Sequence, residues 1–165
     1  MLNKFHDVSS SFSVLEKLQL FNDLFIGRRD VYARGFQSKK YNKMGYSPAC
    51  VNADNKTLCQ RGKIRRSDCP NRVFAQFDLK AIKMHLQGQD EKGRPFIAGL
   101  YPLMPDDTCK LLVVDFDSDN YQTESLSFLS VCDRYHVPAY LERSRSGNGA
   151  HVWFFFKDFV KASVA

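Results

Sequence analysis

Two short motifs carry residues that could do chemistry together. VVDFD places Asp115 and Asp117 two residues apart at the end of an apolar run. The segment SRSGNGAH, residues 144–151, ends at His151 immediately before another apolar run. Neighbouring carboxylates repel each other unless a cation holds both, and hard oxygen ligands favour Mg²⁺ or Mn²⁺. The first motif therefore predicts a divalent-metal site formed by Asp115 and Asp117.

The second motif supplies groups suited to phosphate. Glycines let backbone N–H groups approach phosphate oxygens, while arginine and serine side chains add charge and hydrogen bonds. A divalent metal held by two carboxylates is typical of enzymes that transfer phosphoryl and nucleotidyl groups. We therefore predict Asp115, Asp117 and His151 as catalytic residues. The predicted nucleotide-binding residues are Arg143, Ser144, Arg145, Ser146, Gly147, Asn148, Gly149 and His151.

Each motif also has a plainer interpretation. A D-x-D pair often occurs by chance, SGNG is a good hairpin turn, and a histidine can simply sit at a strand edge. A calcium loop beginning at Asp115 is excluded because its required glycine is Asn120 and its bidentate glutamate is Leu126. The nucleotide interpretation depends on the two motifs meeting in the fold.

The elements that must bring them together follow from hydrophobic patterning. Period-two and continuous apolar runs predict strands, and the segment between the two motifs predicts a helix over residues 121–136. The strands are expected over residues 95–103, 110–117, 137–144 and 151–157. This order matches the first three-quarters of a split βαβ sheet of the ferredoxin or RNA-recognition (RRM-like) type, so the predicted fold class is α+β. A second helix and a fourth strand are expected next, which suggests a shortened chain.

That sheet would place the two motifs side by side. If residues 110–117 form the first strand of the split βαβ sheet and residues 151–157 form its third, these two strands are neighbours. Asp115, Asp117 and His151 would then lie on adjacent strands. Residues two apart on a strand face the same way, so both aspartates project together and Phe116 points to the other face.

The preceding part of the chain is less regular. Residues 13–26 and 78–88 predict helices, whereas the stretch between residues 27 and 72 is broken by Gly, Pro, Asn and Asp. We predict a single domain over residues 1–165. It consists of an irregular basic lobe, residues 1–94, and an incomplete catalytic sheet, residues 95–165.

The positive charge is concentrated in that lobe. The whole chain has a net charge of +6, and residues 28–72 hold twelve Lys or Arg against three Asp. Such a lobe suits a polyanionic partner, although a solvated surface explains the charge equally well.

The bulk properties exclude several classes of protein. No apolar run reaches the roughly 20 residues needed to cross a bilayer, and the start lacks a secretory signal. We expect a cytoplasmic location and no membrane partner. The chain has five cysteines, an odd number that excludes a complete disulfide framework.

Beyond single motifs, the sequence resembles the archaeo-eukaryotic primase superfamily, and more narrowly the primase domain of the TOTE conflict systems of prokaryotes and their mobile elements. The words that carry the resemblance include FIGRRDVYARGFQSKK at 25–40, GYSPAC at 45–50, CPNRVF at 69–74, HLQGQDEKGRPFIAGLYPL at 85–103, VVDFD at 113–117 and PAYLERSRSGNGAHVWFFF at 138–156.

The resemblance implies a nucleotidyltransferase of DNA replication, a primase or primase-polymerase. It would use Mg²⁺ or Mn²⁺ and NTP or dNTP on a DNA or RNA template, alongside helicase or nuclease partners. It implies that Asp115 and Asp117 bind the metal and that His151 and the turn hold the phosphates. The family's third acid would lie beyond residue 165, so the fragment would lack one catalytic ligand.

The resemblance also gives roles to the basic lobe. Relatives carry four cysteines there, whereas this chain keeps Cys50, Cys59 and Cys69, so zinc binding is doubtful; Asp68 or His85 would have to supply the fourth ligand. Tyr32, Phe36 and Tyr41 are available to stack on bases, whereas Arg34 and Asp30 are expected to pair with each other. The residues expected to follow a template backbone are Arg28, Arg29, Lys39, Lys40, Arg61, Lys63, Arg65 and Arg66.

Two other functions fit the same residues. The chain could be a non-catalytic nucleic-acid-binding module whose acids are vestigial, or a metal-dependent nuclease built on the same carboxylates. Dependence of binding on EDTA and on the two aspartates separates the first from the primase hypothesis, and a cleavage assay tests the second.

Overall fold

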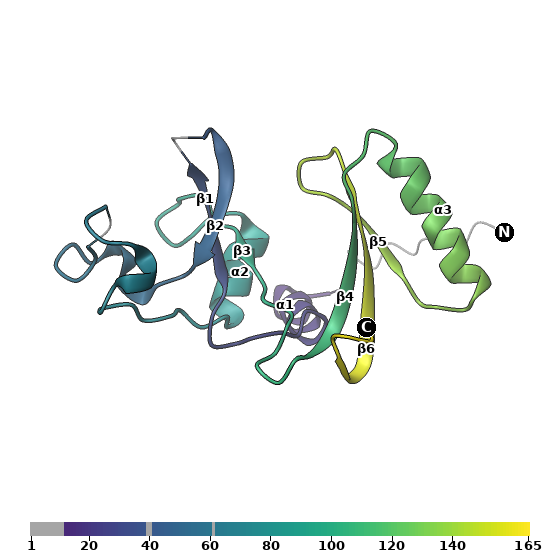
Figure 1. Ribbon diagram of the computed structural model, residues 1–165, viewed down its shortest axis with the longest axis horizontal. Helices are drawn as coiled ribbons and strands as arrows, with labels where there is room; N and C mark the ends of the chain where they lie inside the picture. The colour runs from purple at the N-terminus through teal and green to yellow at the C-terminus, as the bar shows by residue number, and fades with distance from the viewer. Residues whose placement is uncertain (1–11, 39–40, 61) are drawn as a thin grey trace. The chain divides into compact units, whose positions relative to one another are not determined.

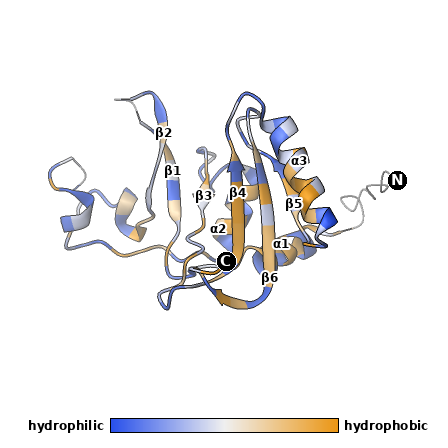
Figure 2. Cartoon of the chain, turned by 45° about the vertical axis from the view of Figure 1, so that its right-hand side comes forward, coloured by the Kyte–Doolittle hydropathy of each residue, from blue (hydrophilic) through white to orange (hydrophobic). Residues whose placement is uncertain are grey.

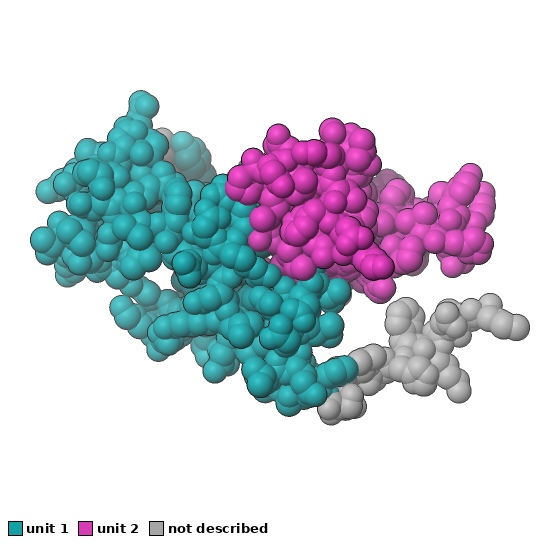
Figure 3. Space-filling model, turned by 90° about the horizontal axis from the view of Figure 1, so that it is seen from below, with its two compact units in different colours: residues 1–24, 28–101 teal, residues 25–27, 102–165 magenta. Residues whose placement is uncertain are grey.

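The computed structural model describes residues 12–38, 41–60 and 62–165 (Figure 1). The chain divides into two compact units, coloured separately in Figure 3. Unit 1 comprises the chain up to Leu24 together with Arg28–Tyr101, and unit 2 comprises Phe25–Gly27 and Pro102–Ala165. Each unit holds its own three-stranded antiparallel sheet. The fold is therefore mixed α and β.

The helices of unit 1 occur where the sequence predicts them. Helix α1, Val14–Leu24, begins at a reciprocal cap in which Glu16 N donates to Ser13 Oγ and Ser13 N donates to a Glu16 carboxylate oxygen. Helix α2, Leu79–Gln87, begins at Asp78, whose side chain accepts from Ala81 N, and ends at Gly88 with φ +72°. Local capping chemistry therefore sets these ends.

The sheet of unit 1 has the order β2-β1-β3. Strands β1, Ala33–Ser38, and β2, Lys43–Pro48, form a hairpin, and two short 3₁₀ helices, η2 (Val51–Asp54) and η3 (Arg66–Asp68), follow it. The sequence predicted a strand over residues 95–103 in the catalytic sheet. The structure has only β3, Ala98–Gly99, and it pairs with β1. Pro95 and Pro102 lack the N–H that a longer ladder would need, which explains the shortening.

The core of unit 1 packs α2 against Tyr32 and Ala49, which flank the β1–β2 hairpin, and against the segment around β3. Ile82 is fully buried and Phe96 is 2% exposed. Tyr32 packs against Phe77 and Phe96, with ring centroids 5.8 and 6.0 Å apart. Leu18 and Phe21 of α1 cover this cluster. The apolar side chains of α1 are thus only partly buried, because Leu15 remains 68% exposed.

Carboxylates in unit 1 are held by arginine and lysine. Arg94 bridges Asp54 at 2.9 Å and Asp90 at 2.8 Å, and Lys92 lies 3.3 Å from Asp54. Hydrogen bonds from Arg94 and then Lys92 lower the pKa of Asp54. Burial opposes ionisation of Asp90, but hydrogen bonds from Arg94 and from the N–H of Lys92 outweigh it and leave that pKa lowered. These contacts tie the 3₁₀ segment η2 to the turn before β3.

The sheet of unit 2 has the order β4-β6-β5. Its strands are β4, Thr108–Phe116, β5, Tyr140–Arg143, and β6, Ala150–Lys161, and helix α3, Tyr121–Arg134, connects β4 to β5. Because β6 lies between β4 and β5 and is antiparallel to both, β4 and β5 run parallel. The first and third strands of the predicted sheet are therefore neighbours. Figure 2 shows the apolar run along β4.

The two faces of this sheet differ. On one face, Phe128 of α3 packs edge-on against Phe116 and Phe154, at 5.6 and 6.2 Å. On the other, Trp153 stacks with Phe155 at an interplanar angle of 9°, and Phe25 meets both rings edge-on. The face opposite α3 thus carries the side chains of β6 that alternate with Phe154, among them Trp153 and Phe155. Among the described residues, no helix is long and apolar enough to span a membrane.

Candidate active site

The site is built on rows of side chains that cross the face of the unit 2 sheet opposite α3. In the first row, Asp115 of β4, His151 of β6 and Glu142 of β5 are direct neighbours in register. His151 Nε2 lies 3.5 Å from Asp115 Oδ1, and His151 Nδ1 lies 3.2 Å from Glu142 Oε2. The imidazole therefore sits between two carboxylates from the flanking strands.

A second row lies one pleat further along. A Cβ placed on Gly149 would come within 3.0 Å of Asp117 Oδ1, 3.2 Å of Ser144 Oγ and 2.9 Å of the Phe116 carbonyl oxygen. Gly149 is two residues before His151, so this Cβ direction belongs to the same face as the His151 side chain. Asp117 and Ser144 therefore converge over Gly149, beside the first row. The close approach requires glycine, because any side chain would displace an oxygen.

The turn between β5 and β6 is stabilised by its own hydrogen bonds. Gly147 adopts φ +80°, which favours glycine, and its N–H donates to the Ser144 carbonyl oxygen at 2.9 Å. The Gly147 carbonyl oxygen accepts from the Arg143 guanidinium and from the Tyr121 hydroxyl. Arg143 is thus folded over the turn, and Tyr121 anchors the turn to the start of α3.

The remaining turn residues predicted to bind nucleotide are accessible. Arg145, Ser146 and Asn148 are exposed. Ser146 Oγ lies 3.0 Å from Ser144 Oγ and accepts from the Asn148 N–H. Two hydroxyls and an arginine therefore stand at the same end of the sheet as Asp117.

The electrostatics of the site favour a cation. The side chain of Asp115 is 56% exposed, and its ion-pair partner in the described part of the chain is His151. Asp117 is exposed and forms no ion pair with a described residue. Two nearby carboxylates without a lysine or arginine partner fit the donor set of a hard divalent ion. Residues 12–38, 41–60 and 62–165 contain no ready-made group of three or more His, Cys, Asp and Glu side chains for a metal, so the fit rests on two carboxylates.

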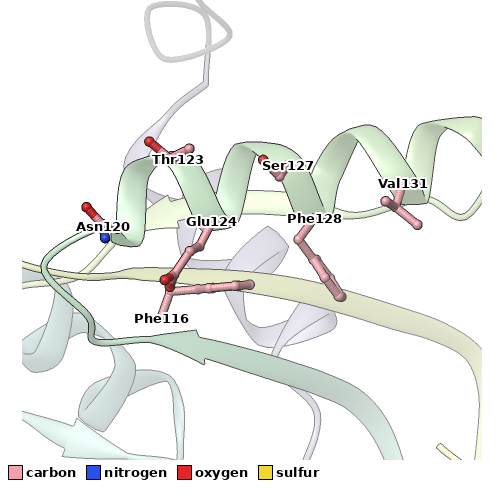
Figure 4. A pocket seen from close by; sticks show the side chains of 7 residues that line it. All are labelled: Phe116, Asn120, Thr123, Glu124, Ser127, Phe128 and Val131. Carbon is pink, nitrogen blue, oxygen red and sulfur yellow. The ribbon is translucent and has the colours of Figure 1, made fainter.

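A hollow of the described surface lies elsewhere. It is lined by Phe116, Asn120, Thr123, Glu124, Ser127, Phe128 and Val131, which Figure 4 shows beneath α3. Phe116 points to the face opposite Asp115, so this groove and the acidic rows lie on opposite sides of the sheet. The groove is mainly apolar and does not include the predicted catalytic residues.

The basic residues predicted to follow a template differ in availability. Lys63 and Arg65 are exposed, whereas Arg28 makes a two-point contact with Asp30, and Arg29 donates to the Asn22 carbonyl oxygen at 2.8 Å. Burial lowers the pKa of Arg29. Arg66 donates to Ser47 and lies 5.3 Å from the ring centre of Phe36. Lys39, Lys40 and Arg61 lie outside the described residues.

Two expectations for unit 1 are wrong. Tyr32 is 7% exposed and packs in the core, so it cannot stack on a base. Phe36 and Tyr41 remain accessible, at 39% and 66%. Asp30 pairs with Arg28 instead of Arg34, whose guanidinium lies over the Phe96 ring at 3.9 Å. The hydrogen bond from Arg28 lowers the pKa of Asp30.

The cysteines behave as free thiols. Cys50, Cys59 and Cys69 are half-buried in unit 1, and the described residues offer no group of three or more side chains, including Asp68 and His85, that could hold zinc. Cys109 and Cys132 are buried in unit 2, in keeping with the role of small apolar side chains.

Sequence reasoning missed Glu142 and Trp153. Trp153 Nε1 donates to Glu142 Oε2 at 2.7 Å, so both belong to the His151 environment. The signal was present: if Ser144 and Gly149 close the hairpin, then Glu142 must face His151 two residues further out on each strand. Tyr121 was predicted only as the start of a helix.

Comparison with known proteins identifies one family. The family model described as the archaeo-eukaryotic primase domain of the TOTE conflict system matches residues 16–165. The match spans both compact units and every residue of the two acidic rows. No curated protein and no solved structure matches the chain significantly.

Proposed function

Because this chain belongs to the archaeo-eukaryotic primase domain family of TOTE conflict systems, we propose that unit 2 carries the nucleotidyltransferase site of a primase or primase-polymerase. The substrates are NTP or dNTP, and the product is a nucleic-acid strand made on a DNA or RNA template. The observation that carries the proposal is the pair of rows on one sheet face. They bring Asp115, Asp117, His151 and the Ser144–Gly149 turn together.

In this proposal the two aspartates hold Mg²⁺ or Mn²⁺. Their carboxylates lie on one face, exposed and without a lysine or arginine partner among the described residues. A divalent ion bound there supplies charge neutralisation at the reacting phosphate and lowers the pKa of an attacking hydroxyl.

The turn holds the phosphates of the incoming nucleotide. The hydroxyls of Ser144 and Ser146, 3.0 Å apart, and the exposed guanidinium of Arg145 can donate to phosphate oxygens. His151 Nε2 points toward Asp115 and is the ring nitrogen available to a phosphate beside the acids. These groups need no large movement, because the turn is already ordered by its hydrogen bonds to Gly147.

Unit 2 supplies the strand order of a split βαβ sheet, which supports an RRM-like catalytic module. Unit 1 would guide the template, with Lys63 and Arg65 as the exposed cations and with Phe36 and Tyr41 as stacking groups. A cytoplasmic role in replication beside a helicase or nuclease completes the proposal.

A binding experiment tests the proposal directly. The single tryptophan of the chain lies in the site, with its ring centroid 5.8 Å from that of His151, so its fluorescence reports ligand binding. We expect Mg²⁺ with NTP to change the Trp153 signal, and EDTA to reverse the change. Asp115→Asn with Asp117→Asn should abolish the response and any template-directed extension.

The matched control removes the same charge elsewhere. Asp119→Asn with Asp133→Asn changes two exposed aspartates of unit 2 and should leave binding intact. If nucleotide binds equally well with and without the Asp115 and Asp117 carboxylates, the nucleotidyltransferase proposal fails. Single-strand binding that ignores EDTA and these substitutions would instead indicate a non-catalytic binding module, and strand cleavage without synthesis would indicate a nuclease.

A further inference from the structure

We propose that Glu142 is a positioning residue that fixes the ring of His151 toward the acidic pair and the nucleotide. The inference rests on the proposed function, because it assigns His151 to the nucleotide. The contact between Glu142 and His151 can nevertheless be tested without any nucleotide.

The geometry is a single carboxylate oxygen shared by two donors. Glu142 Oε2 accepts from Trp153 Nε1 at 2.7 Å and lies 3.2 Å from His151 Nδ1. Glu142 is the register partner of His151 on the adjacent strand, and Trp153 follows His151 on the same face. Both donors therefore reach Glu142 directly across one strand pair.

The indole makes the position of that oxygen definite. Trp153 can only donate through Nε1, so it holds Oε2 in one place. The indole is itself held by its stack on Phe155, at 6.4 Å and 9°, and by the edge of Phe25 at 5.1 Å. The carboxylate thus rests on an ordered aromatic support, although the Glu142 side chain is 53% exposed.

The shared oxygen determines which end of the imidazole is free. An ionised carboxylate accepts only, so the ring nitrogen facing Glu142 must carry a proton. Nδ1 is then engaged, and Nε2 is directed toward Asp115 at 3.5 Å. Rotation of the ring by half a turn would break the Glu142 contact. Glu142 therefore selects the ring orientation that presents Nε2 to a phosphate.

Stability is a poor alternative explanation for this contact. Exposed ion pairs contribute little to folding, and the sheet retains its backbone ladder and aromatic packing without the carboxylate. By contrast, removing the partner that orients a metal-ligating histidine typically changes metal affinity or activity by about 10–100-fold, and Glu142 holds His151 by the same kind of contact. We expect Glu142→Gln to weaken nucleotide binding within that range while leaving the fold intact.

The first measurement is made on the protein without nucleotide. Long-range proton–nitrogen NMR spectra should show the neutral His151 ring protonated on Nδ1, with His151→Ala giving the assignment. The single indole N–H should be shifted and slow to exchange with solvent, and both the Nδ1 proton and this indole signature should be lost in Glu142→Ala, which leaves no acceptor at this position. If the wild-type ring instead carries its proton on Nε2, or if the indole signal is unchanged in Glu142→Ala, the proposal is overturned.

The second measurement is the affinity for Mg²⁺ with NTP, determined by calorimetry. We expect an order of affinity in which the wild type is tightest, Trp153→Phe is weaker and Glu142→Gln is weakest, because Trp153→Phe keeps the ring and removes only the supporting donor. The control is Glu91→Gln, which removes an equal charge and an exposed pair with Lys80 at 2.8 Å. Its affinity should match that of the wild type.

The two measurements separate this inference from the proposed function. Equal affinity of Glu142→Gln and Glu91→Gln would refute the positioning role even if nucleotide binds well. If the wild type binds no nucleotide, the proposed function fails, and the ring tautomer alone decides whether Glu142 orients His151.

Discussion

The two units treat their carboxylates in opposite ways. In unit 1, Asp30, Asp54 and Asp90 are each paired with arginine, and their pKa values are lowered. In unit 2, Asp115 has only His151 as an ion-pair partner, and Asp117 has none among the described residues.

This difference separates structural acids from available ones. A carboxylate whose charge is matched by a neighbouring guanidinium has little to gain from an added cation, because the attraction is already satisfied. Two exposed carboxylates on one sheet face, without such neighbours, repel each other and favour a cation from solution. The arginine-matched acids of unit 1 therefore serve the fold, whereas Asp115 and Asp117 of unit 2 remain available to a cation.

The largest expected effect tests whether the units depend on separate cores. Ile82→Ala removes a fully buried side chain from unit 1 and should cost about 2–5 kcal/mol in the free energy of unfolding. Below the unfolding transition, the unit 2 site should still bind Mg²⁺ with NTP, because it shares no core residue with Ile82. Chemical denaturation followed by nucleotide titration checks both statements.

Ile64→Ala is the control, since Ile64 is 36% exposed and should cost much less. Loss of nucleotide binding in Ile82→Ala under conditions where the protein remains folded would contradict the separation of the units.

The next largest effect is expected on replacing Gly149, which leaves room for the Asp117 carboxylate. Gly149→Ala places a Cβ 2.9 Å from the Phe116 carbonyl oxygen and 3.0 Å from Asp117 Oδ1, an overpacking that should cost about 1–3 kcal/mol. Asp117 should be displaced, so the affinity for Mg²⁺ with NTP should fall in calorimetry.

Gly99→Ala gives the matched change in unit 1, because its Cβ would make an ordinary contact at 3.5 Å. Similar losses of stability and affinity in both variants would show that the convergence over Gly149 has no special role.

A smaller effect concerns the exposed cations of unit 1. Lys63→Ala and Arg65→Ala should each reduce the salt dependence of single-strand binding, by about 0.7 in the log–log slope for each phosphate that the variant no longer neutralises. Lys80→Ala is the control, because Lys80 pairs with Glu91. Fluorescence anisotropy at several salt concentrations measures the slope. An unchanged slope in both variants would place the template elsewhere.

The smallest expected effect concerns how the carboxylates of unit 1 that pair with arginine contribute to stability at acidic pH. The Asp54 pKa is lowered in the folded protein, so its stabilising contribution is complete above its unfolded pKa of about 3.9 and is lost as pH falls through the folded value. Arg94→Met removes both ion pairs of Arg94, so the free energy of unfolding should fall less steeply as the pH is lowered. At neutral pH the effect should be small, because exposed ion pairs contribute little to stability.

Thermal melts between neutral and acidic pH measure this loss of stability. Lys80→Met is the control, because it removes one isolated ion pair. If stability falls as steeply with decreasing pH in Arg94→Met as in the wild type, other carboxylates determine the loss of stability at acidic pH.

Local sequence patterns predicted much of unit 2. The apolar runs around Asp115 and His151 gave β4 and β6, and period-two alternation placed Asp115 on the face opposite Phe116. The segment 95–103 was harder, because its alternation resembles a strand while its prolines limit the ladder to Ala98–Gly99. The pairing of this segment with β1 could not be predicted from neighbouring residues in the sequence.

The sequence alone therefore determined which residues could do chemistry and which family the chain resembles, because residue type and short-range spacing are local properties. Only the tertiary structure decided which acids are matched by arginines and which stay free, and that Glu142 and Trp153 border His151. Those outcomes depend on register and on contacts between distant segments, where Gly149 must leave room for Asp117 and one Glu142 oxygen contacts both Trp153 and His151.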